Sequence, residues 1–178
     1  MTRLLLLFFS MITLSATAQS ILGIKVGESY TNALNYLRAR YGKYNPPVEE
    51  DGNLFLTNFD IGGITFSYGT FYFQWSMGVE ARFSGAEFQK WTSVNDTQSM
   101  KRDRDYIKNV LSSKYMVLSH VNDQGFKCYI FASDEENGIV MNGTLDLLRS
   151  KGNNGKEHLY LILTYAPEAD FIHRNSDF

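Results

Sequence analysis

The segment Gly63–Phe73, GITFSYGTFYF, decides the fold because a degenerate second copy of it lies at Gly138–Leu147, GIVMNGTLDL. Both copies begin with Gly-Ile. Both then reach a Gly-Thr pair that is followed by an apolar residue, any residue and a second apolar residue. Apolar residues that alternate around glycines are typical of strands and hairpins. The two copies therefore indicate a duplicated β-hairpin unit.

Other segments recur in the same order. Leu37-x-x-Arg40-Tyr41, at the end of a first predicted helix, corresponds to Leu111-x-x-Lys114-Tyr115 at the end of a second. In the last strands Val79, Ala81 and Phe83 align with Leu161, Leu163 and Tyr165. We therefore expect two tandem α/β repeats, at residues 19–97 and 98–178.

One conflict concerns the second copy. A two-residue turn at Asn142-Gly143 would put Ile139 and Met141 on the face of Asp146, opposite to the pattern of the first copy. The second hairpin must therefore bend elsewhere or carry a bulge.

Two helices are predicted. Apolar residues recur every three or four positions in Tyr30–Tyr41, Ser29 suits the N-cap, and Gly42 suits a left-handed residue after the last turn. The second helix is expected at Met100–Tyr115. Its charged run, Lys101–Asp105, is expected to be a solvated surface.

Strands are predicted at Asn53–Phe59, Ile64–Tyr68, Thr70–Ser76 and Gly78–Ser84, and again at Met116–Val121, Phe126–Ala132, Gly138–Arg149 and His158–Tyr165. Between the halves, Ala86–Trp91 is expected to form a short helical turn and Thr92–Thr97 a polar link. Alternation directs one set of residues inward: Ile64, Phe66, Phe71, Phe73, Val79, Ala81 and Phe83. The predicted fold class is α+β, in which two tandem helix-plus-four-stranded antiparallel units form one long sheet with both main helices on one face.

The N-terminus has the pattern of an export signal at residues 1–18. Arg3 supplies the positive charge, Leu4–Leu14 is an apolar run, and Ala16-Thr17-Ala18 offers a cleavage site. The alternative is an N-terminal membrane anchor, for which the run is short. We expect a bacterial protein of the periplasm or cell exterior, with no membrane span after cleavage. A disulfide-free chain with one cysteine, Cys128, fits that compartment better than secretion from a eukaryote.

The polar residues offer no catalytic pattern. The three histidines share no metal-ligand spacing, no nucleophile elbow occurs, and the glycines form no phosphate loop. Cys128 lies in an apolar alternation and is expected to be a buried small residue rather than a reactive thiol. With 17 basic and 19 acidic residues, the charge gives no reason to expect nucleic acid. We expect no enzymatic activity, no cofactor and no metal site.

This layout resembles the β-lactamase-inhibitor-protein-like fold, in which two tandem α/β units join their sheets into one concave surface. The start Gly27-x-Ser29, followed by Ala33 and Leu37, also resembles the helix opening of that group and of small outer-membrane assembly lipoproteins. The chain departs from the group because it has no disulfide pair, no lipidated cysteine and no matching Gly-x-Ser before the second helix. The resemblance implies the fold and a general binding role, but no target.

Aromatic residues make up 15% of the chain. Alternation turns part of them toward the helix-free face of the sheet, where aromatic side chains give contact area at low entropic cost. The candidate binding residues there are Tyr72, Gln74, Arg82, Lys127, Tyr129, His158 and Tyr160. We expect a protein-binding module whose partner is another protein. The alternatives are a structural or assembly component of the cell envelope, and a small-ligand or glycan binder that uses Trp75 or Trp91.

Overall fold

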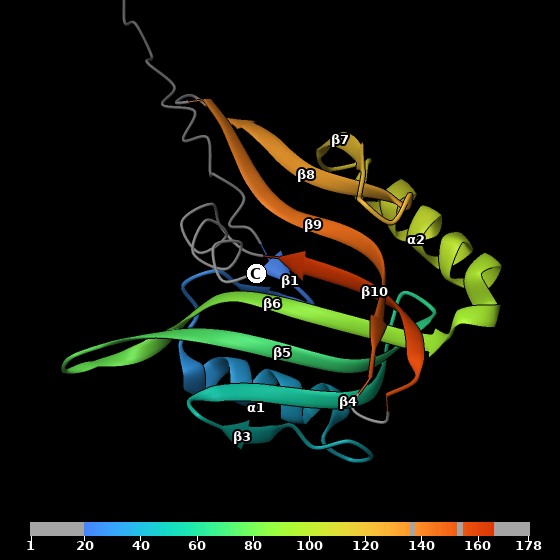
Figure 1. Cartoon of the computed structure of the whole chain (residues 1–178). Helices are drawn as coiled ribbons and strands as arrows, with labels where there is room; N and C mark the ends of the chain where they lie inside the picture. The colour runs from blue at the N-terminus through green and yellow to red at the C-terminus, as the bar shows by residue number, and fades with distance from the viewer. Residues whose placement is uncertain (1–19, 136–137, 153–154, 166–178) are drawn as a thin grey trace, which may run out of the picture.

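A computed structural model describes residues 20–135, 138–152 and 155–165 (Figure 1). The predicted signal peptide and the chain from Pro167 lie outside the described residues. The described chain is α+β and mostly sheet, with a large antiparallel sheet and two α-helices, as the sequence predicts at this level.

The large sheet has eight strands: β3 (Val48–Glu50), β4 (Asn53–Ile61), β5 (Ile64–Ser76), β6 (Val79–Ser93), β7 (Met116–Val121), β8 (Lys127–Glu135), β9 (Gly138–Lys151) and β10 (Glu157–Tyr165). Their order is β3-β4-β5-β6-β10-β9-β8-β7, and every neighbouring pair is antiparallel. The pair β6–β10 therefore joins the N-terminal strands to the C-terminal ones. A separate two-stranded piece consists of β1 (Ser20–Ile21) and β2 (Ile24–Lys25).

Helix α1 (Tyr30–Tyr41) has the predicted bounds and the predicted N-cap. The Ser29 Oγ accepts from the Asn32 N–H at 3.2 Å, and the Glu80 carboxylate accepts from the Thr31 N–H at 2.9 Å. The predicted role of Gly42 is wrong, because its φ of −57° is right-handed. A Cβ at Gly42 would lie 2.3 Å from the Arg38 carbonyl oxygen, so this position needs glycine for space.

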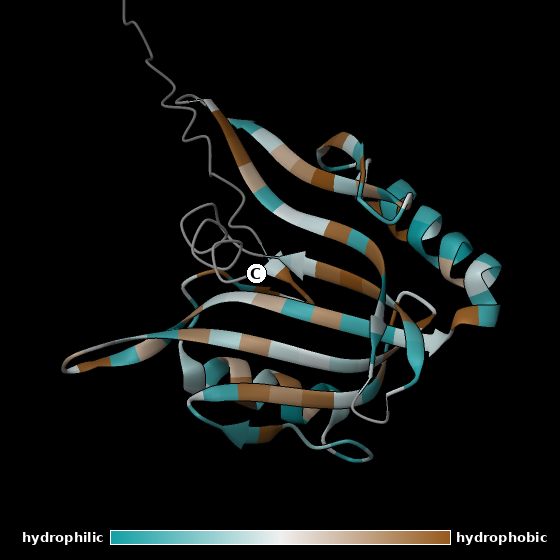
Figure 2. Cartoon of the chain, in the orientation of Figure 1, coloured by the Kyte–Doolittle hydropathy of each residue, from teal (hydrophilic) through white to brown (hydrophobic). Residues whose placement is uncertain are grey.

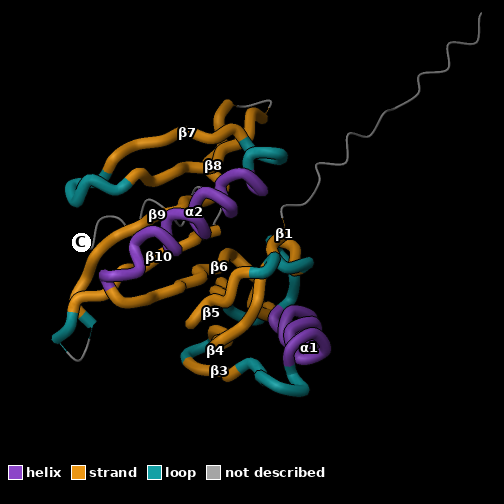
Figure 3. Tube along the Cα trace, turned by 90° about the vertical axis from the view of Figure 1, so that its right-hand side faces the viewer, coloured by secondary structure: helices purple, strands orange, loops and turns teal. Residues whose placement is uncertain are grey.

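Helix α2 (Thr97–Leu111) follows a 3-10 turn, η1 (Val94–Asp96), and crosses in front of the C-terminal strands in Figure 3. The expectation of a fully solvated Lys101–Asp105 run is wrong at Arg104, which is only 7% exposed. Its Nη1 donates to the Lys127 carbonyl oxygen at 2.9 Å. Asp103, in the same run, forms an ion pair with Lys90 of β6 at 2.6 Å.

One hydrophobic core joins both helices to the sheet. Along β5 and β6, apolar and polar residues alternate (Figure 2). All the predicted inward residues are buried except Val79, which is 54% exposed beside the tip of the β5–β6 hairpin. That hairpin extends beyond the rest of the sheet in Figure 1, and the position of Val79 next to its tip accounts for the exposure.

Two strand predictions in the N-terminal half are wrong. First, β5 runs through Gly69 without a break. A Cβ there would lie 2.5 Å from the Phe59 ring and 3.0 Å from the Phe88 ring, so glycine makes room for two core rings instead of forming a turn. Second, Ala86–Trp91 is strand, because every residue of this stretch of β6 pairs with β10 and Ala86–Gln89 also pair with β5.

The predicted conflict at Asn142-Gly143 is resolved in both of the expected ways, because the hairpin bends elsewhere and β9 carries a bulge. Strand β9 is continuous through Asn142-Gly143, and the connection to β8 lies between Glu135 and Gly138. The β8–β9 register shifts between Phe131 and Ala132. Because of that one-residue shift, Leu145 and Leu147 face the core. Asn142 and Gly143, which lie at the shift, are buried as well.

Candidate functional site

The face of the sheet opposite the hydrophobic core is called the outer face here. Strand β10 defines it, because Leu159, Leu161 and Leu163 are buried in the core. The residues between them, His158, Tyr160, Ile162 and Thr164, are half-buried and point to the outer face. Their cross-strand partners share that face.

An aromatic cluster lies on the outer face at the junction of β6 and β10. It consists of Trp91, His158 and Tyr160. Tyr160 pairs directly with Trp91, and the His158 ring stands edge-on to both, with centroids 5.1 Å from Trp91 and 6.4 Å from Tyr160. The Trp91 side chain is 51% exposed. This cluster therefore presents a large aromatic surface beside half-buried polar groups.

The aromatic surface continues toward β4. Ile162 pairs with Gln89, Gln89 pairs with Tyr68, and the Tyr68 and Phe55 rings lie 5.7 Å apart. Ile162, Gln89 and Tyr68 lie in one row across β10, β6 and β5, and Phe55 of β4 lies diagonally from Tyr68, which pairs with Thr57. Two further aromatic side chains, Tyr68 and Phe55, therefore lie on the outer face beyond the aromatic cluster.

The structure brings together only some of the predicted binding residues. His158 and Tyr160 belong to the aromatic cluster. Tyr72 pairs with Gly85, and Gln74 pairs with Arg82, near the projecting end of the β5–β6 hairpin. Gly85 and Trp91 are six residues apart on β6, which at about 3.3 Å per residue is roughly 20 Å. Tyr72, Gln74 and Arg82 therefore lie too far away to share one small site with Tyr160.

Lys127 and Tyr129 lie on the core side, which corrects the predicted alternation of β8. Tyr129 is buried, its ring lies 5.7 Å from the Arg104 guanidinium, and its hydroxyl contacts Asp105 of α2. Burial raises the pKa of Tyr129. The Lys127 ammonium lies 5.5 Å from the same ring. Tyr129 pairs with the core residue Leu145, so the pleat of β8 has the opposite phase to the predicted alternation and turns Tyr129 and Lys127 to the core side.

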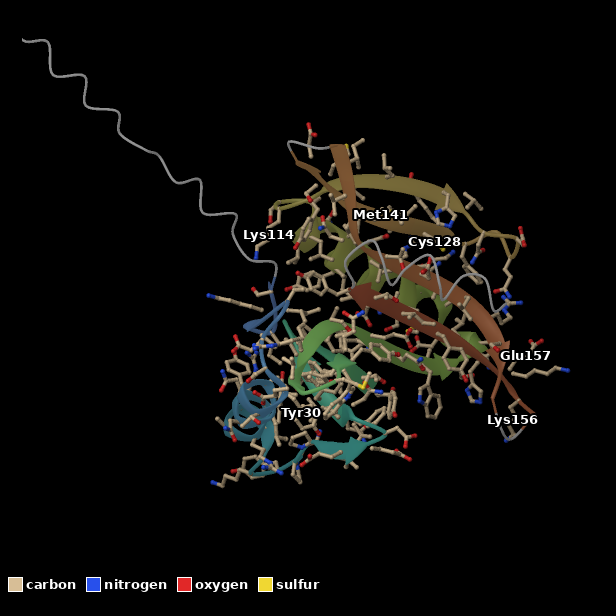
Figure 4. All side chains as sticks on the ribbon, turned by 90° about the vertical axis from the view of Figure 1, so that its left-hand side faces the viewer. Tyr30, Lys114, Cys128, Met141, Lys156 and Glu157 are labelled. Carbon is tan, nitrogen blue, oxygen red and sulfur yellow. The ribbon has the colours of Figure 1, made fainter. Side chains whose placement is uncertain are left out.

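A second group of side chains, missed from the sequence, meets on the outer face of the C-terminal strands. His120, Cys128 and Asp146 each offer one nitrogen, sulfur or oxygen ligand atom, and these atoms lie within 4.8 Å of one another. Figure 4 labels Cys128 among these strands, far from Tyr30 on α1. Burial raises the pKa of the Cys128 thiol, which disfavours a free reactive thiolate. These three residues are called the ligand cluster here.

A hollow at the corner where β9 meets β10 is lined by Gln124, Arg149, Ser150, Lys151 and Glu157. Figure 4 labels Lys156 and Glu157 at this corner. The Gln124 side chain is engaged with the Arg149 backbone, donating at 2.8 Å and accepting at 2.5 Å. The lining contains no cysteine or histidine, so it does not pair a histidine base with a nucleophile.

Comparisons with protein-family models, with curated proteins and with solved structures found no match to this chain. In the described residues, neither α1 nor α2 has the length and apolar character that crossing a membrane requires.

Proposed function

We propose that this chain is an exported, non-enzymatic module that binds another protein on the outer face of its sheet. The observation that carries the proposal is the aromatic cluster, in which the half-exposed Trp91 lies against His158 and Tyr160. Tryptophan and tyrosine dominate the binding energy of protein interfaces, because they contribute large contact areas while losing little conformational entropy. The cross-strand neighbours of His158 are Ser93 and Ser150, whose polar side chains suit the rim of such an interface.

The architecture that goes with this proposal is a tandem pair of α/β units, residues 19–97 and 98–178, with both helices on one face. The two Gly-Thr pairs support it, because they have equivalent positions in their ladders. Gly69 pairs with Leu56, and Gly143 pairs with Phe131. On the other side Gly69 pairs with Phe88, and Gly143 pairs with Tyr165.

This pairing changes one part of the sequence alignment. Ala86 and Phe88, rather than Ala81 and Phe83, correspond to Leu163 and Tyr165. The resulting outer face is the helix-free surface that a fold like that of the β-lactamase-inhibitor-protein group would offer to a partner. The proposal takes only that general role from the resemblance.

Export is also part of the proposal, and it would place the outer face and its partner in the periplasm or outside the cell. Residues 1–18 carry the charge, apolar run and small residues of a signal peptide. N-terminal sequencing of the protein recovered from the periplasm or medium of a bacterial host should begin at Gln19. Recovery of the intact N-terminus in the membrane fraction would contradict export and favour an anchor.

The two tryptophans provide a matched test of the outer face. Trp75 is 62% exposed and alternates with the buried Phe73, so it faces the α1 side, where its ring lies 6.0 Å from that of Tyr30. The full chain, with Trp91→Ala and Trp75→Ala variants, would be used to capture partners from extracts of the exported compartment. Affinity for each captured protein would then be measured by titration.

We expect Trp91→Ala to weaken binding by roughly 30-fold or more, which corresponds to the loss of about 2 kcal/mol typical of a central interface residue. Trp75→Ala should bind as the unaltered chain does. Equal affinity of both variants would remove the outer face as the binding surface. Binding of glycans rather than proteins, lost in Trp91→Ala alone, would favour the glycan alternative, to which the exposed Trp91 ring is also suited.

A further inference from the structure

The ligand cluster is built by the register of three neighbouring strands. His120 of β7 pairs directly with Cys128 of β8. Tyr129, the next residue of β8, pairs with Leu145 of β9, so Cys128 stands beside Asp146. Directly opposed residues in an antiparallel sheet have Cβ atoms about 4.5–5.5 Å apart. The backbone therefore holds an imidazole, a thiol and a carboxylate side by side on the outer face.

We propose that His120, Cys128 and Asp146 bind a divalent transition-metal ion, with Zn²⁺ as the best fit. Their ligand atoms lie within 4.8 Å of one another. Zinc bonds to nitrogen, oxygen and sulfur are about 2.0–2.3 Å long, so tetrahedral ligand atoms lie roughly 3.5 Å apart. Side-chain rotations that move the ligand atoms by about 1 Å would bring them to this spacing, and the strands would not have to move.

The ligand types select the metal. Thiolate and imidazole favour Zn²⁺ and its neighbours in the transition series, whereas Mg²⁺ and Ca²⁺ prefer sites made of oxygen alone. Three protein ligands leave a fourth position for water or for a group from a bound molecule. The Asp146 carboxylate already accepts from the Thr144 hydroxyl at 2.8 Å, which orients it as outer-shell partners orient metal-binding carboxylates.

A catalytic Cys–His–Asp triad is the competing explanation, and the geometry disfavours it. In a triad the histidine lies between the nucleophile and the acid. Here the order across the sheet is His120, Cys128, Asp146, which puts the thiol in the middle. The Cys128 side chain is also only 1% exposed, so a substrate could not approach its sulfur. A metal ion can bind a buried sulfur when the other two ligands reach over it.

Cobalt provides the probe, because a thiolate bound to Co²⁺ has a near-ultraviolet charge-transfer band. The full chain, reduced and free of metal, would be titrated with Co²⁺ and then with Zn²⁺. We expect the band to appear at one equivalent and to disappear on zinc addition. Zinc should also raise the melting temperature, since a ligand that binds only the folded chain stabilises it.

Two histidines on the same face provide the matched control. His120→Ala should lose the cobalt band, and Cys128→Ser should lose it with little change in side-chain volume. His158→Ala, in the aromatic cluster, should keep it. Thr144→Val should weaken metal affinity by about 10-fold or more, as outer-shell substitutions do. Circular dichroism of each variant would establish that it is folded.

The proposal is overturned if the folded chain shows no cobalt band, or if His120→Ala retains the band and the affinity of the unaltered chain. It is also overturned if His158→Ala loses the band as fully as His120→Ala does. These outcomes are separate from the proposed protein binding, which rests on Trp91 and is read out as partner affinity, not as a cobalt band.

Discussion

The buried Arg104 of α2 offers a sharp test of the packing. Its guanidinium donates to the Lys127 carbonyl oxygen and to the Asp105 carboxylate, and it lies over the Tyr129 ring. A hydrogen bond from a charged group contributes about 1.5–3 kcal/mol, and a cation–π contact about 0.5–2 kcal/mol, more when it is buried. Asp105 is half-exposed, so its ion pair with Arg104 adds little. Arg104→Ala should therefore lower the free energy of unfolding by about 3 kcal/mol.

Urea and thermal denaturation would measure this loss. In a domain of this size 3 kcal/mol corresponds to a fall in Tm of about 6–12 °C. Arg102→Ala is the matched control, because Arg102 is an exposed arginine on the same helix. Arg104→Met, which keeps an apolar stem, should lose less than Arg104→Ala. If Arg104→Ala and Arg102→Ala both change stability by less than about 0.5 kcal/mol, the typical effect at a surface position, then Arg104 is solvated and the described packing of α2 is wrong.

Two further predictions concern the core and the pH dependence. Gly143→Ala would place a Cβ 2.1 Å from the Thr164 carbonyl oxygen. Gly143→Ala should lower the free energy of unfolding by about 3 kcal/mol or more. The loss should exceed that of Gly69→Ala, because the neighbours of Gly69 are rings that can shift. Equal losses for the two variants in urea denaturation would contradict this. Burial, with the hydrogen bond to Glu49, raises the pKa of Tyr30 to about 12. The folded chain therefore keeps the Tyr30 proton when the unfolded chain loses it, and stability should fall between about pH 10 and pH 12, less steeply in Tyr30→Phe. Equal slopes in both proteins would refute the assignment.

Local sequence signals are sufficient to predict an element whose structure depends on its own residues alone. Ser29 and the apolar spacing of Tyr30–Tyr41 predicted α1 to the residue, because capping and amphipathicity are local. The sequence wrongly predicts a break at Gly69, because a glycine that makes room for rings looks the same in sequence as a glycine in a turn. Ala86–Trp91 was misassigned because its strand state depends on β10, which lies far along the chain.

The burial of the charged Arg104 side chain could not be predicted from the sequence either. The Lys101–Asp105 run has the composition of a solvated surface, yet the Arg104 side chain points from α2 toward the sheet and lies over the Tyr129 ring. An arginine can bury its aliphatic stem and donate its hydrogen bonds to a carbonyl group. The composition of a charged run therefore does not determine whether each arginine in it is exposed. Tyr129 faces the core because it pairs with Leu145, and the predicted alternation has the opposite phase because β8 carries apolar residues on both faces.

Two of the three residues of the ligand cluster can be brought together from the sequence alone. The turn Asn122-Asp123-Gln124-Gly125 sets the β7–β8 register, and a hairpin closed there puts His120 opposite Cys128. Asp146 could not be added, because the bulge between Phe131 and Ala132 shifts β9 by one residue. Without the bulge Asp146 would face the core. Search by linear ligand spacing fails here because the three residues belong to three strands.

The two proposed sites lie on one continuous face. Ile162 pairs with Asp146 on one side and with Gln89 on the other. Neighbouring strands are about 4.8 Å apart, so Asp146 and Gln89 lie roughly 10 Å from each other, which is about the diameter of one α-helix. A protein that covers Trp91 and Tyr160 therefore reaches the edge of the ligand cluster. Any effect of a bound metal on partner affinity must then equal the effect of the partner on metal affinity, because coupling between two binding sites is reciprocal.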